Sequence, residues 1–436
     1  MSNQQGEKKI KLLEAMSIGI GGMVGGGIFA VLGLAVTLAQ GGTPVAFLVA
    51  GIIALLTSYS YTKLSLTYPD KGGTVRFINE GFGKNVFSGG ANNLLWICYV
   101  VMLSLYASAF GSYAPNLISI TGDKGIDFHI AASFVIIFAT LINYYSIKVV
   151  GQIESIAVVI KLIILISFVG IGLYGLSGNL NLDQLNYSNW KTPFQVFSGG
   201  MVIFVAYEGF ELIANAAPSI ENPQKNIPRA YYYSVLFVIV LYILISIVTV
   251  GSLAFKEIAK AQDYVLAEAA KPMLGQVGFT IITVAALIST FSAINASLYG
   301  GSRVSYEISE DDELPHELTS QLWNQPVGLM ITAVLTLVIC NTIDLESIST
   351  SGSIGFLIVF ALVNYVAFKR SKEVNGNKWI PMAGIFMTSI ATIALITEQF
   401  QTNKMGLAIA LSIVLVSFLI EFFYKRSEAY RRNSMK

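Results

Sequence analysis

Three ionisable side chains stand inside long apolar stretches of this 436-residue chain. Lys161 lies in SIAVVIKLIILISFVG, and Glu208 and Glu211 lie in FVAYEGFELIANAAPSIENP. A charge at the centre of a membrane helix costs roughly 2.5–3.5 kcal/mol on insertion scales, and such residues commonly mark ion or proton pathways. We expect the two glutamates to carry protons or to lock a gate. The alternative is that either one faces a wet vestibule without such a role.

Lys161 has apolar neighbours on both sides, so its ammonium is too deep to reach the membrane surface comfortably. One interpretation is a structural lysine paired with a carbonyl or an acid. The other is a titrating ammonium that occupies a cation position. The later stretch AALISTFSAINASLYGG offers the hydroxyls of Ser289, Thr290 and Ser292, which could coordinate Na⁺ or pair with Lys161. These hydroxyls could instead bond back to their own helix carbonyls.

The first apolar stretch, SIGIGGMVGGGIFAVLG, contains seven glycines, six of them between Gly19 and Gly27. Glycine costs about 1 kcal/mol relative to alanine inside a helix. Backbone without helix partners is tolerated at membrane depth only where protein or a water-filled cavity surrounds it. The glycines therefore predict a deliberate break in the first membrane helix. The alternative is close packing of helices through small residues.

A break at this place would expose backbone groups of both signs. Near Gly25, Gly26 and Gly27 a second half-helix would begin, and its free N–H groups would favour a carboxylate. Near Ile20 and Gly21 the first half-helix would end, and its carbonyls would favour a cation.

A second break is expected where Gly209 stands between the two glutamates. Phe204 and Tyr207 beside it could cover a bound substrate or simply pack. Interrupted helices in corresponding positions and opposite orientation are typical of transporters built from inverted repeats. The functional site is therefore expected between the two breaks.

Composition agrees with a membrane protein. The chain is 54% hydrophobic and 12% charged, whereas soluble domains average about 25% charged. The net charge of +1 argues against a nucleic-acid partner. No zinc or disulfide spacing is present, so no metal site is expected.

About twelve apolar stretches satisfy the length of roughly 20 residues that a membrane helix needs. They are 12–39, 43–67, 86–117, 130–147, 152–176, 193–216, 230–254, 277–302, 326–343, 347–368, 379–397 and 404–424. With twelve spans, 20 of the 27 lysines and arginines fall on the side of the termini and 6 on the other. This bias predicts a cell membrane protein with both termini in the cytoplasm. The loop 68–85 is expected to form a short surface helix.

Several motifs resemble those of the amino acid–polyamine–organocation permeases, from about residue 12 to 430. The first span contains GGGIF, the following loop contains YPDKGGTVRFINEGFGKN, and the second break and its exit contain AYEGFE and ENPQKNIPRA. VVIKLIILI and YGGSRVSYEISEDDELP fit as well. Within the family, the chain is most similar to proton-coupled transporters of broad amino acid specificity.

The resemblance implies an all-α polytopic LeuT-like fold in which helices 1 and 6 are broken. Two inverted five-helix repeats, 12–176 and 193–368, would be followed by two additional helices at 379–424. The cytoplasmic tails would be 1–11 and 425–436.

The resemblance also implies that the substrate α-carboxylate binds at the first break and the α-amine at carbonyls of both breaks. The residues expected at the substrate are Ile20, Gly21, Gly25, Gly26, Gly27, Phe204, Val205, Ala206, Tyr207 and Gly209.

Lys161 matches a family lysine that fills the place of a sodium ion, with Gly21 and Ser289 around it. Glu211 matches a family glutamate one turn past the second break, whereas Glu208 is additional. The coupling set implied in this way is Lys161, Gly21, Ser289, Glu208 and Glu211.

Two departures from the family pattern stand out. Thr74 replaces the tyrosine that often follows the paired glycines of the first loop. Pro218 and Ser219 stand where a glutamate is usual, which puts an inherited salt bridge at the cytoplasmic gate in doubt.

The function expected from these features is secondary active transport of amino acids by alternating access with proton symport. It would use the proton gradient, no cofactor and no Na⁺, and it would not be an enzyme. The alternatives are an amino acid exchanger, a permease for polyamines or other organic cations, and a membrane amino acid sensor that does not transport.

Overall fold

The computed structural model describes residues 9–145, 147–176, 181–310, 321–322 and 325–434, and this part of the chain is mostly helical. The elements up to the second break are α1 (Leu12–Met23), α2 (Gly27–Ala39), α3 (Thr43–Thr67), α4 (Thr74–Phe82), α5 (Val86–Tyr113), η1 (Ala114–Asn116), α6 (Lys124–Tyr145), α7 (Ile147–Leu176), η2 (Leu182–Leu185), η3 (Tyr187–Asn189), α8 (Pro193–Val202), η4 (Phe204–Glu211), α9 (Leu212–Ala216) and η5 (Ala217–Ser219). The remainder are α10 (Pro223–Ser252), α11 (Phe255–Lys260), η6 (Gln262–Tyr264), α12 (Val265–Glu310), β1 (Gln321–Leu322), β2 (Gln325–Pro326), α13 (Val327–Thr342), α14 (Leu345–Lys369), α15 (Trp379–Thr402) and α16 (Lys404–Ser434).

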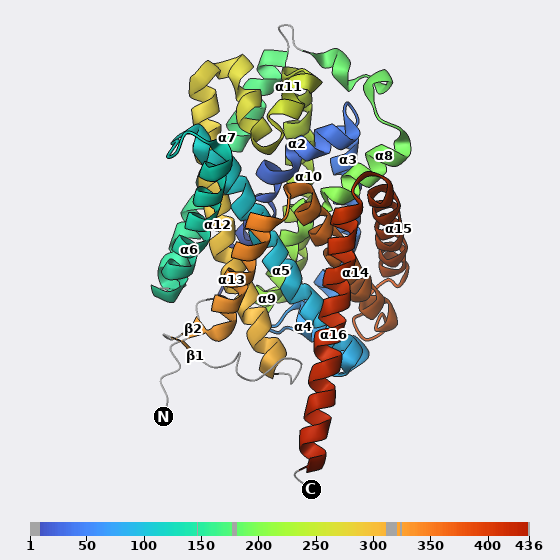
Figure 1. The fold of residues 1–436 in the computed structure, drawn as a ribbon. Coiled ribbons are helices and arrows are strands. Elements are labelled where there is room, and N and C mark those ends of the chain that lie inside the picture. Colours follow the sequence, from blue (N-terminus) through green and yellow to red (C-terminus); the bar gives the residue numbers. More distant parts are fainter. Residues whose placement is uncertain (1–8, 146, 177–180, 311–320, 323–324, 435–436) are drawn as a thin grey trace.

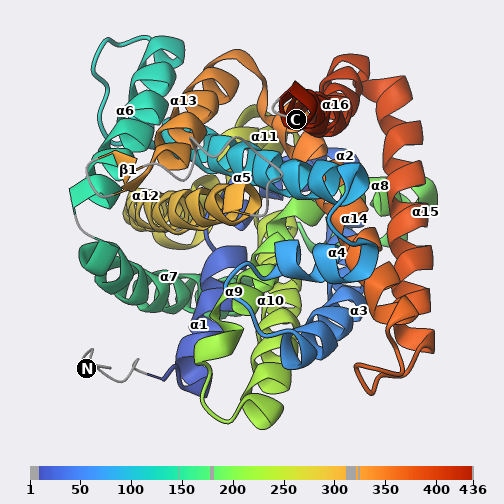
Figure 2. The same cartoon turned by 90° about the horizontal axis from the view of Figure 1, so that it is seen from below.

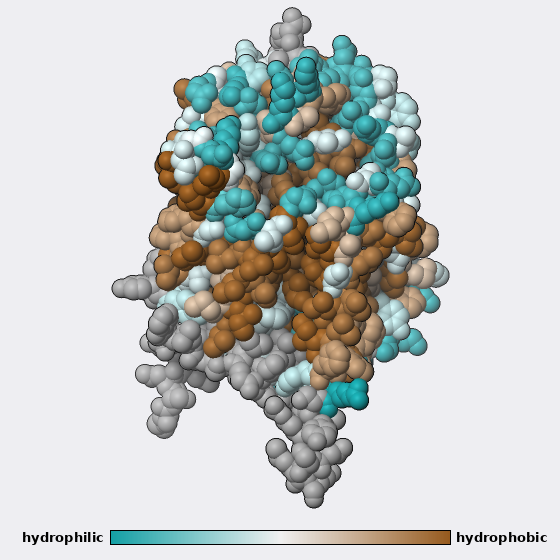
Figure 3. Space-filling view, viewed as in Figure 1, coloured by the Kyte–Doolittle hydropathy of each residue, from teal (hydrophilic) through white to brown (hydrophobic). Residues whose placement is uncertain are grey.

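The expectation of an all-α polytopic membrane protein is confirmed. Among the described residues, nine helices are long and apolar enough to cross a bilayer, and two bent helix pairs bring this number to 11. The 16-residue α13 is shorter and lies at the predicted span 326–343. On the face drawn in Figure 3, hydrophobic residues cover the middle of the molecule and hydrophilic residues gather above them.

Both predicted breaks are present. α1 and α2 meet at a bend of 44°, and so do α8 and the stretch from Phe204 to Ser219. The second break is a run of 3₁₀ helix, η4, in the middle of the span. The backbone at both breaks lies inside the protein, since residues 21–30 and 201–211 are all buried, and Figure 1 shows α2 among the other helices.

The two broken spans touch through their backbones. A Cβ atom on Gly209 would lie 2.2 Å from the carbonyl carbon of Gly22 and 2.4 Å from the nitrogen of Met23. No side chain fits in such a space, so glycine is required where η4 crosses α1. The glycine-rich stretch of the first span therefore provides both a helix break and a close packing contact, the two interpretations that the sequence left open.

α5 forms the centre of the bundle. In its most apolar window 89% of the residues are buried, against 28% for α16 and 33% for α15. Seen from below, α5 crosses the middle and α15 lies at the edge (Figure 2). The last two helices are therefore peripheral, and α5 is placed to contact both breaks.

The chain begins and ends at the same end of the bundle, the lower one in Figure 1. There the start of the chain is joined to the exit of the second break. The amide of Ile10 donates to the carbonyl of Ser219 at 2.8 Å, and the amide of Glu221 donates to the carbonyl of Ile10 at 2.9 Å. The predicted helix in the loop 68–85 exists as α4, and it reaches the surface on one face, where Arg76 is exposed. Its side chains at Val75, Phe77 and Ile78 are buried.

We expect Gly209→Ala to destabilise the protein, because the new methyl group would collide with the backbone of Gly22 and Met23, which cannot move away as a flexible side chain could. Overpacking typically costs about 1–3 kcal/mol. The matched control is Gly170→Ala in α7, where an added Cβ meets nothing within 4 Å. That control should be neutral or stabilising by up to about 1 kcal/mol, since alanine is the better helix former. Thermal unfolding of both variants in detergent measures the difference, and equal stabilities would contradict the tight crossing.

Candidate functional site

The first break ends one helix and starts another within three residues. The amide of Val24 donates to the carbonyl of Ile20 at 2.8 Å and closes α1, and the amide of Ala30 donates to the carbonyl of Gly26 at 2.9 Å and opens α2. The N–H groups of the first turn of α2, from Gly27 onward, therefore have no carbonyl partner within the helix. This end of α2 has a partial positive charge at the centre of the bundle. The carbonyl of Ile20, expected to face a cation, already has one donor.

Tyr242 of α10 joins the two breaks. Its hydroxyl lies 2.6 Å from the carbonyl oxygen of Met23 and 3.3 Å from that of Ala206. Met23 is the last residue of α1, where the carbonyl has no partner within the helix, and Ala206 lies in the 3₁₀ helix η4. The hydroxyl therefore supplies a donor that the interrupted helices do not provide themselves.

Ser289 of α12 also supplies a hydroxyl donor to the first break. Its hydroxyl lies 2.6 Å from the carbonyl oxygen of Gly25 and 3.1 Å from that of Val24. Thr290 beside it bonds back to the carbonyl of Ala286 in its own helix at 2.7 Å. Of these two hydroxyls, that of Ser289 contacts the break.

Lys161 is fully buried in α7, and its ammonium donates to the carbonyl of Gly21 at 2.9 Å. The bond joins α7 to the last turn of α1. The structure thus brings Lys161, Gly21 and Ser289 to the same broken helix, with Lys161 and Ser289 on different carbonyls. A carbonyl partner agrees with both interpretations of Lys161, the structural one and the cation position.

The two intramembrane glutamates point to the same neighbour. A 3₁₀ helix has three residues per turn, so Glu208 and Glu211 share one face of η4. On α5, Tyr99 and Tyr106 are seven residues apart and also share a face. The hydroxyl of Tyr106 donates to Oε1 of Glu208 at 3.2 Å, and that of Tyr99 donates to Oε1 of Glu211 at 2.6 Å. The pair of acids is therefore matched by a pair of tyrosines.

Glu211 is saturated with donors. Besides Tyr99, its Oε2 accepts from the hydroxyl of Thr74 at 2.7 Å and from that of Tyr61 at 3.4 Å. These partners come from three elements, α3, α4 and α5, and the carboxyl group is 1% exposed. Thr74, a departure from the family pattern, is thus a direct partner of the family glutamate.

Tyr106 also touches the first break. A Cβ on Gly26 would lie 2.0 Å from Cδ1 of the Tyr106 ring, while the hydroxyl of the same ring is on Glu208. Sequence reasoning missed this residue. The signal that could have found it is the seven-residue spacing to Tyr99, which places two hydroxyls on one face of an apolar helix.

The two aromatic residues expected to cover a substrate are engaged in packing. Tyr207 donates to the carbonyl of Phe47 at 2.9 Å, and its ring centroid lies 5.2 Å from that of Tyr242. Phe204 packs edge-on against Phe360 of α14 at 5.9 Å. Both side chains are buried in the surrounding helices.

The remaining backbone of the second break is bound by serines of α14. Ser353 accepts from the amide of Val205 at 3.1 Å and donates to the carbonyl of Val202 at 2.8 Å. Ser349 donates to the same carbonyl at 2.7 Å. No group of three or more His, Cys, Asp or Glu side chains in the described part of the chain is placed to hold a metal ion.

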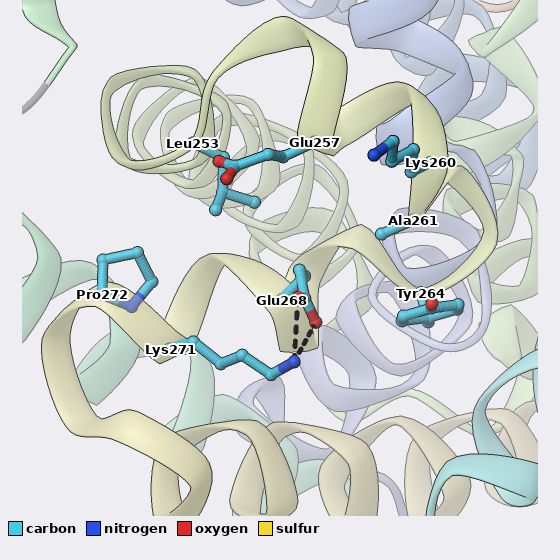
Figure 4. A pocket seen from close by; sticks show the side chains of 8 residues that line it. All are labelled: Leu253, Glu257, Lys260, Ala261, Tyr264, Glu268, Lys271 and Pro272. Carbon is cyan, nitrogen blue, oxygen red and sulfur yellow. Dashed lines mark hydrogen bonds and ion pairs between the residues drawn. The ribbon is translucent and has the colours of Figure 1, made fainter.

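Two hollows lie away from the breaks, around the segment that joins α10 to α12. One, of about 560 Å³, lies between α11 and the start of α12, where Lys271 points to Glu268 and pairs with it at 2.8 Å (Figure 4). The other, of about 610 Å³, is lined in part by Ser108, two residues beyond Tyr106 on α5. The second hollow therefore comes within one helical turn of the tyrosine that contacts both breaks.

We expect Gly26→Leu to abolish substrate binding, because its side chain would fill the space at the start of α2 and displace Tyr106. Gly170→Leu, which adds the same side chain at an open position on α7, should bind normally. Equilibrium binding of labelled amino acids to the purified, monodisperse variants measures this. Unchanged affinity in Gly26→Leu would remove the start of α2 from the site.

We expect Thr74→Val, which keeps the shape but removes a hydroxyl from Glu211, to lower stability by about 1–3 kcal/mol. It should also shift the pH dependence of transport more than the affinity for substrate. The control is Thr342→Val at the exposed end of α13, whose hydroxyl bonds back within its own helix. Thermal unfolding and uptake across a pH series measure both effects. A wild-type stability and pH profile would show that Glu211 does not depend on this donor.

Comparison with known proteins agrees with these features. The family model described as amino acid permease matches residues 10–422. The chain is 33% identical to the uncharacterized protein MJ0609 of Methanocaldococcus jannaschii, over 96% of each chain. It is 31% identical to the inner membrane transport protein YbaT of Escherichia coli, over 97% of this chain and 98% of that one. The serine/threonine exchanger SteT of Bacillus subtilis is 24% identical, with the same coverage. The chain, with its two broken helices crossing at glycines, belongs to the amino acid permease family.

Proposed function

We propose that this permease is a secondary active transporter that moves amino acids by alternating access together with protons. The observation that carries the proposal is the crossing of two broken helices at Gly22 and Gly209, with the free start of α2 on one side and Lys161 on the other. In this arrangement a zwitterionic substrate and a cation position share one broken helix.

The substrate α-carboxylate would bind the N–H groups at Gly26 and Gly27, where the dipole of α2 favours negative charge. The α-amine would lie toward the carbonyls of the breaks. Several of these carbonyls already accept from Tyr242 or Ser289, but a carbonyl oxygen has a second lone pair. A polyamine has no carboxylate and would not use the start of α2, so amino acids fit better than polyamines.

Lys161 would serve as the coupling cation. Two unit charges 4 Å apart repel by about 4 kcal/mol even at an effective dielectric of 20, so Na⁺ is disfavoured beside a charged lysine. In its protonated form Lys161 holds α7 to α1 through the carbonyl of Gly21. Loss of the proton toward the cytoplasm would weaken this bond and let that side open.

The architecture proposed for this motion has two inverted repeats, 12–176 and 193–368. The support is that the broken spans α1–α2 and α8–η4 are each the first of a predicted group of five and bend by the same 44°. The distribution of lysine and arginine supports an orientation with both termini in the cytoplasm.

Uptake of a panel of labelled amino acids into proteoliposomes tests the proposal, with a proton gradient and with a Na⁺ gradient separately. We expect accumulation that depends on the proton gradient and is indifferent to Na⁺. Exchange is the second candidate, because one relative is named a serine/threonine exchanger. Transport only into vesicles preloaded with amino acid would identify exchange and exclude symport.

We expect Lys161→Ala and the volume-preserving Lys161→Met to lose proton-driven accumulation while retaining substrate binding, since the substrate lies at the neighbouring breaks. Lys191→Ala, a change in a loop, is the control. Binding and uptake are measured on the same preparations. Normal accumulation in both Lys161 variants would exclude the lysine as the coupling group.

A further inference from the structure

Glu208 is a buried carboxyl group whose hydrogen bonding is incomplete. Its side chain is 3% exposed. Oε1 accepts from Tyr106 at 3.2 Å, whereas Oε2 has no hydrogen-bond partner among the described residues. A buried carboxyl oxygen without a donor is costly, above all when the group is charged. Such a position is suited to a donor that arrives with a ligand.

Glu211, in the same helix, accepts hydrogen bonds on both of its carboxyl oxygens. It lies one 3₁₀ turn further along the same face of η4, and its donors are hydroxyl groups. The protein thus completes the shell of Glu211 and leaves that of Glu208 open. The difference lies in the number of donors that the surrounding helices supply, because both acids are equally buried.

The carboxyl group of Glu208 is connected to the start of α2 through Tyr106. The ring of Tyr106 is against Gly26 while its hydroxyl is on Glu208, so one tyrosine ring separates Gly26 from the carboxyl group. A Cβ on Gly27 would lie 3.0 Å from Cα of Ala206, two residues before Glu208. The partial positive charge at the start of α2 and the acid are therefore separated by a single side chain, that of Tyr106.

An α-amino acid carries two groups that suit such a pair, a carboxylate for the start of α2 and an ammonium for the acid. Its carboxylate and ammonium are attached to one carbon, whereas the ammonium of a lysine side chain stands at the end of a four-carbon stem. The α-ammonium group has three N–H donors, and the carbonyls of Met23 and Ala206, both within reach of the Tyr242 hydroxyl, leave it room for a further acceptor beside them. A carboxylate is a stronger acceptor for an ammonium than a neutral carbonyl.

We propose that Glu208 binds the α-ammonium group of the substrate through Oε2 and thereby selects amino acids over 2-hydroxy acids of the same shape. This inference rests on the proposed transport function and assigns the recognition of one chemical group within it.

The test replaces the carboxyl group of Glu208 by a neutral amide and the ammonium group of the ligand by a hydroxyl group. Purified wild-type protein and Glu208→Gln are titrated at one pH with L-alanine and L-lactate, and with L-phenylalanine and L-phenyllactate. Wild type should bind the amino acids about 10- to 100-fold more tightly than the hydroxy acids, as expected for a hydrogen bond between charged groups. Glu208→Gln should lose that preference through weaker binding of the amino acids, with hydroxy acid binding little changed.

The matched control is Glu398→Gln, the same substitution at a buried acid of α15 away from the breaks, which should behave as wild type. If Glu208→Gln is not monodisperse, Glu208→Asp replaces it. That variant keeps the charge but retracts it by one methylene, and it should reduce the preference.

Three results are decisive in different ways. A Glu208→Gln protein that still prefers amino acids to hydroxy acids overturns the inference and leaves the transport function standing. A selective loss of L-lysine relative to L-alanine overturns it as well, because Glu208 would then contact a side chain. A wild-type protein that neither binds nor takes up amino acids would overturn the proposed function itself.

Discussion

The backbone contact between Gly22 of α1 and Gly209 of η4 is the constraint on which the rest of the site depends. Two helices can approach this closely only where neither has a side chain, and at membrane depth they can be interrupted only if other groups take up the released hydrogen bonds. Both requirements are met within a few residues. The crossing therefore fixes where the polar backbone of the two spans is exposed and in which direction it points.

The released backbone groups are satisfied by side chains from unbroken helices. Ser289 of α12 and Ser353 of α14 each contact two backbone groups of one broken span, and Tyr242 of α10 contacts one carbonyl of each. Each of them is short or has a rigid ring, so the bond is made with little loss of side-chain freedom. The unbroken helices thus act as a scaffold that holds the broken ones in shape, and Lys161 is the charged member of the same arrangement.

The sequence predicts the parts of the fold that depend on local composition. Glycines near Gly26 and the acids around Gly209 indicate the two breaks, because each is costly inside an ordinary membrane helix. Partners remote in the chain are less accessible. The contact of Thr74 with Glu211, across 137 positions, depends on where α4 folds back into the bundle. For the same reason the packing of Tyr207 into its neighbours could not be read from its position beside a break.

The join between Ile10 and the exit of the second break has a consequence for how the protein responds to its surroundings. It consists of two backbone hydrogen bonds, made next to Pro218 and Ser219, where the sequence puts a salt bridge at this gate in doubt. A salt bridge weakens as ionic strength rises, whereas a bond between neutral peptide groups has no net charge to screen. Closure at this end of the permease thus has a component that is insensitive to salt and does not titrate. Changes of pH or salt at this end would act through ionisable groups and leave the join itself unaffected.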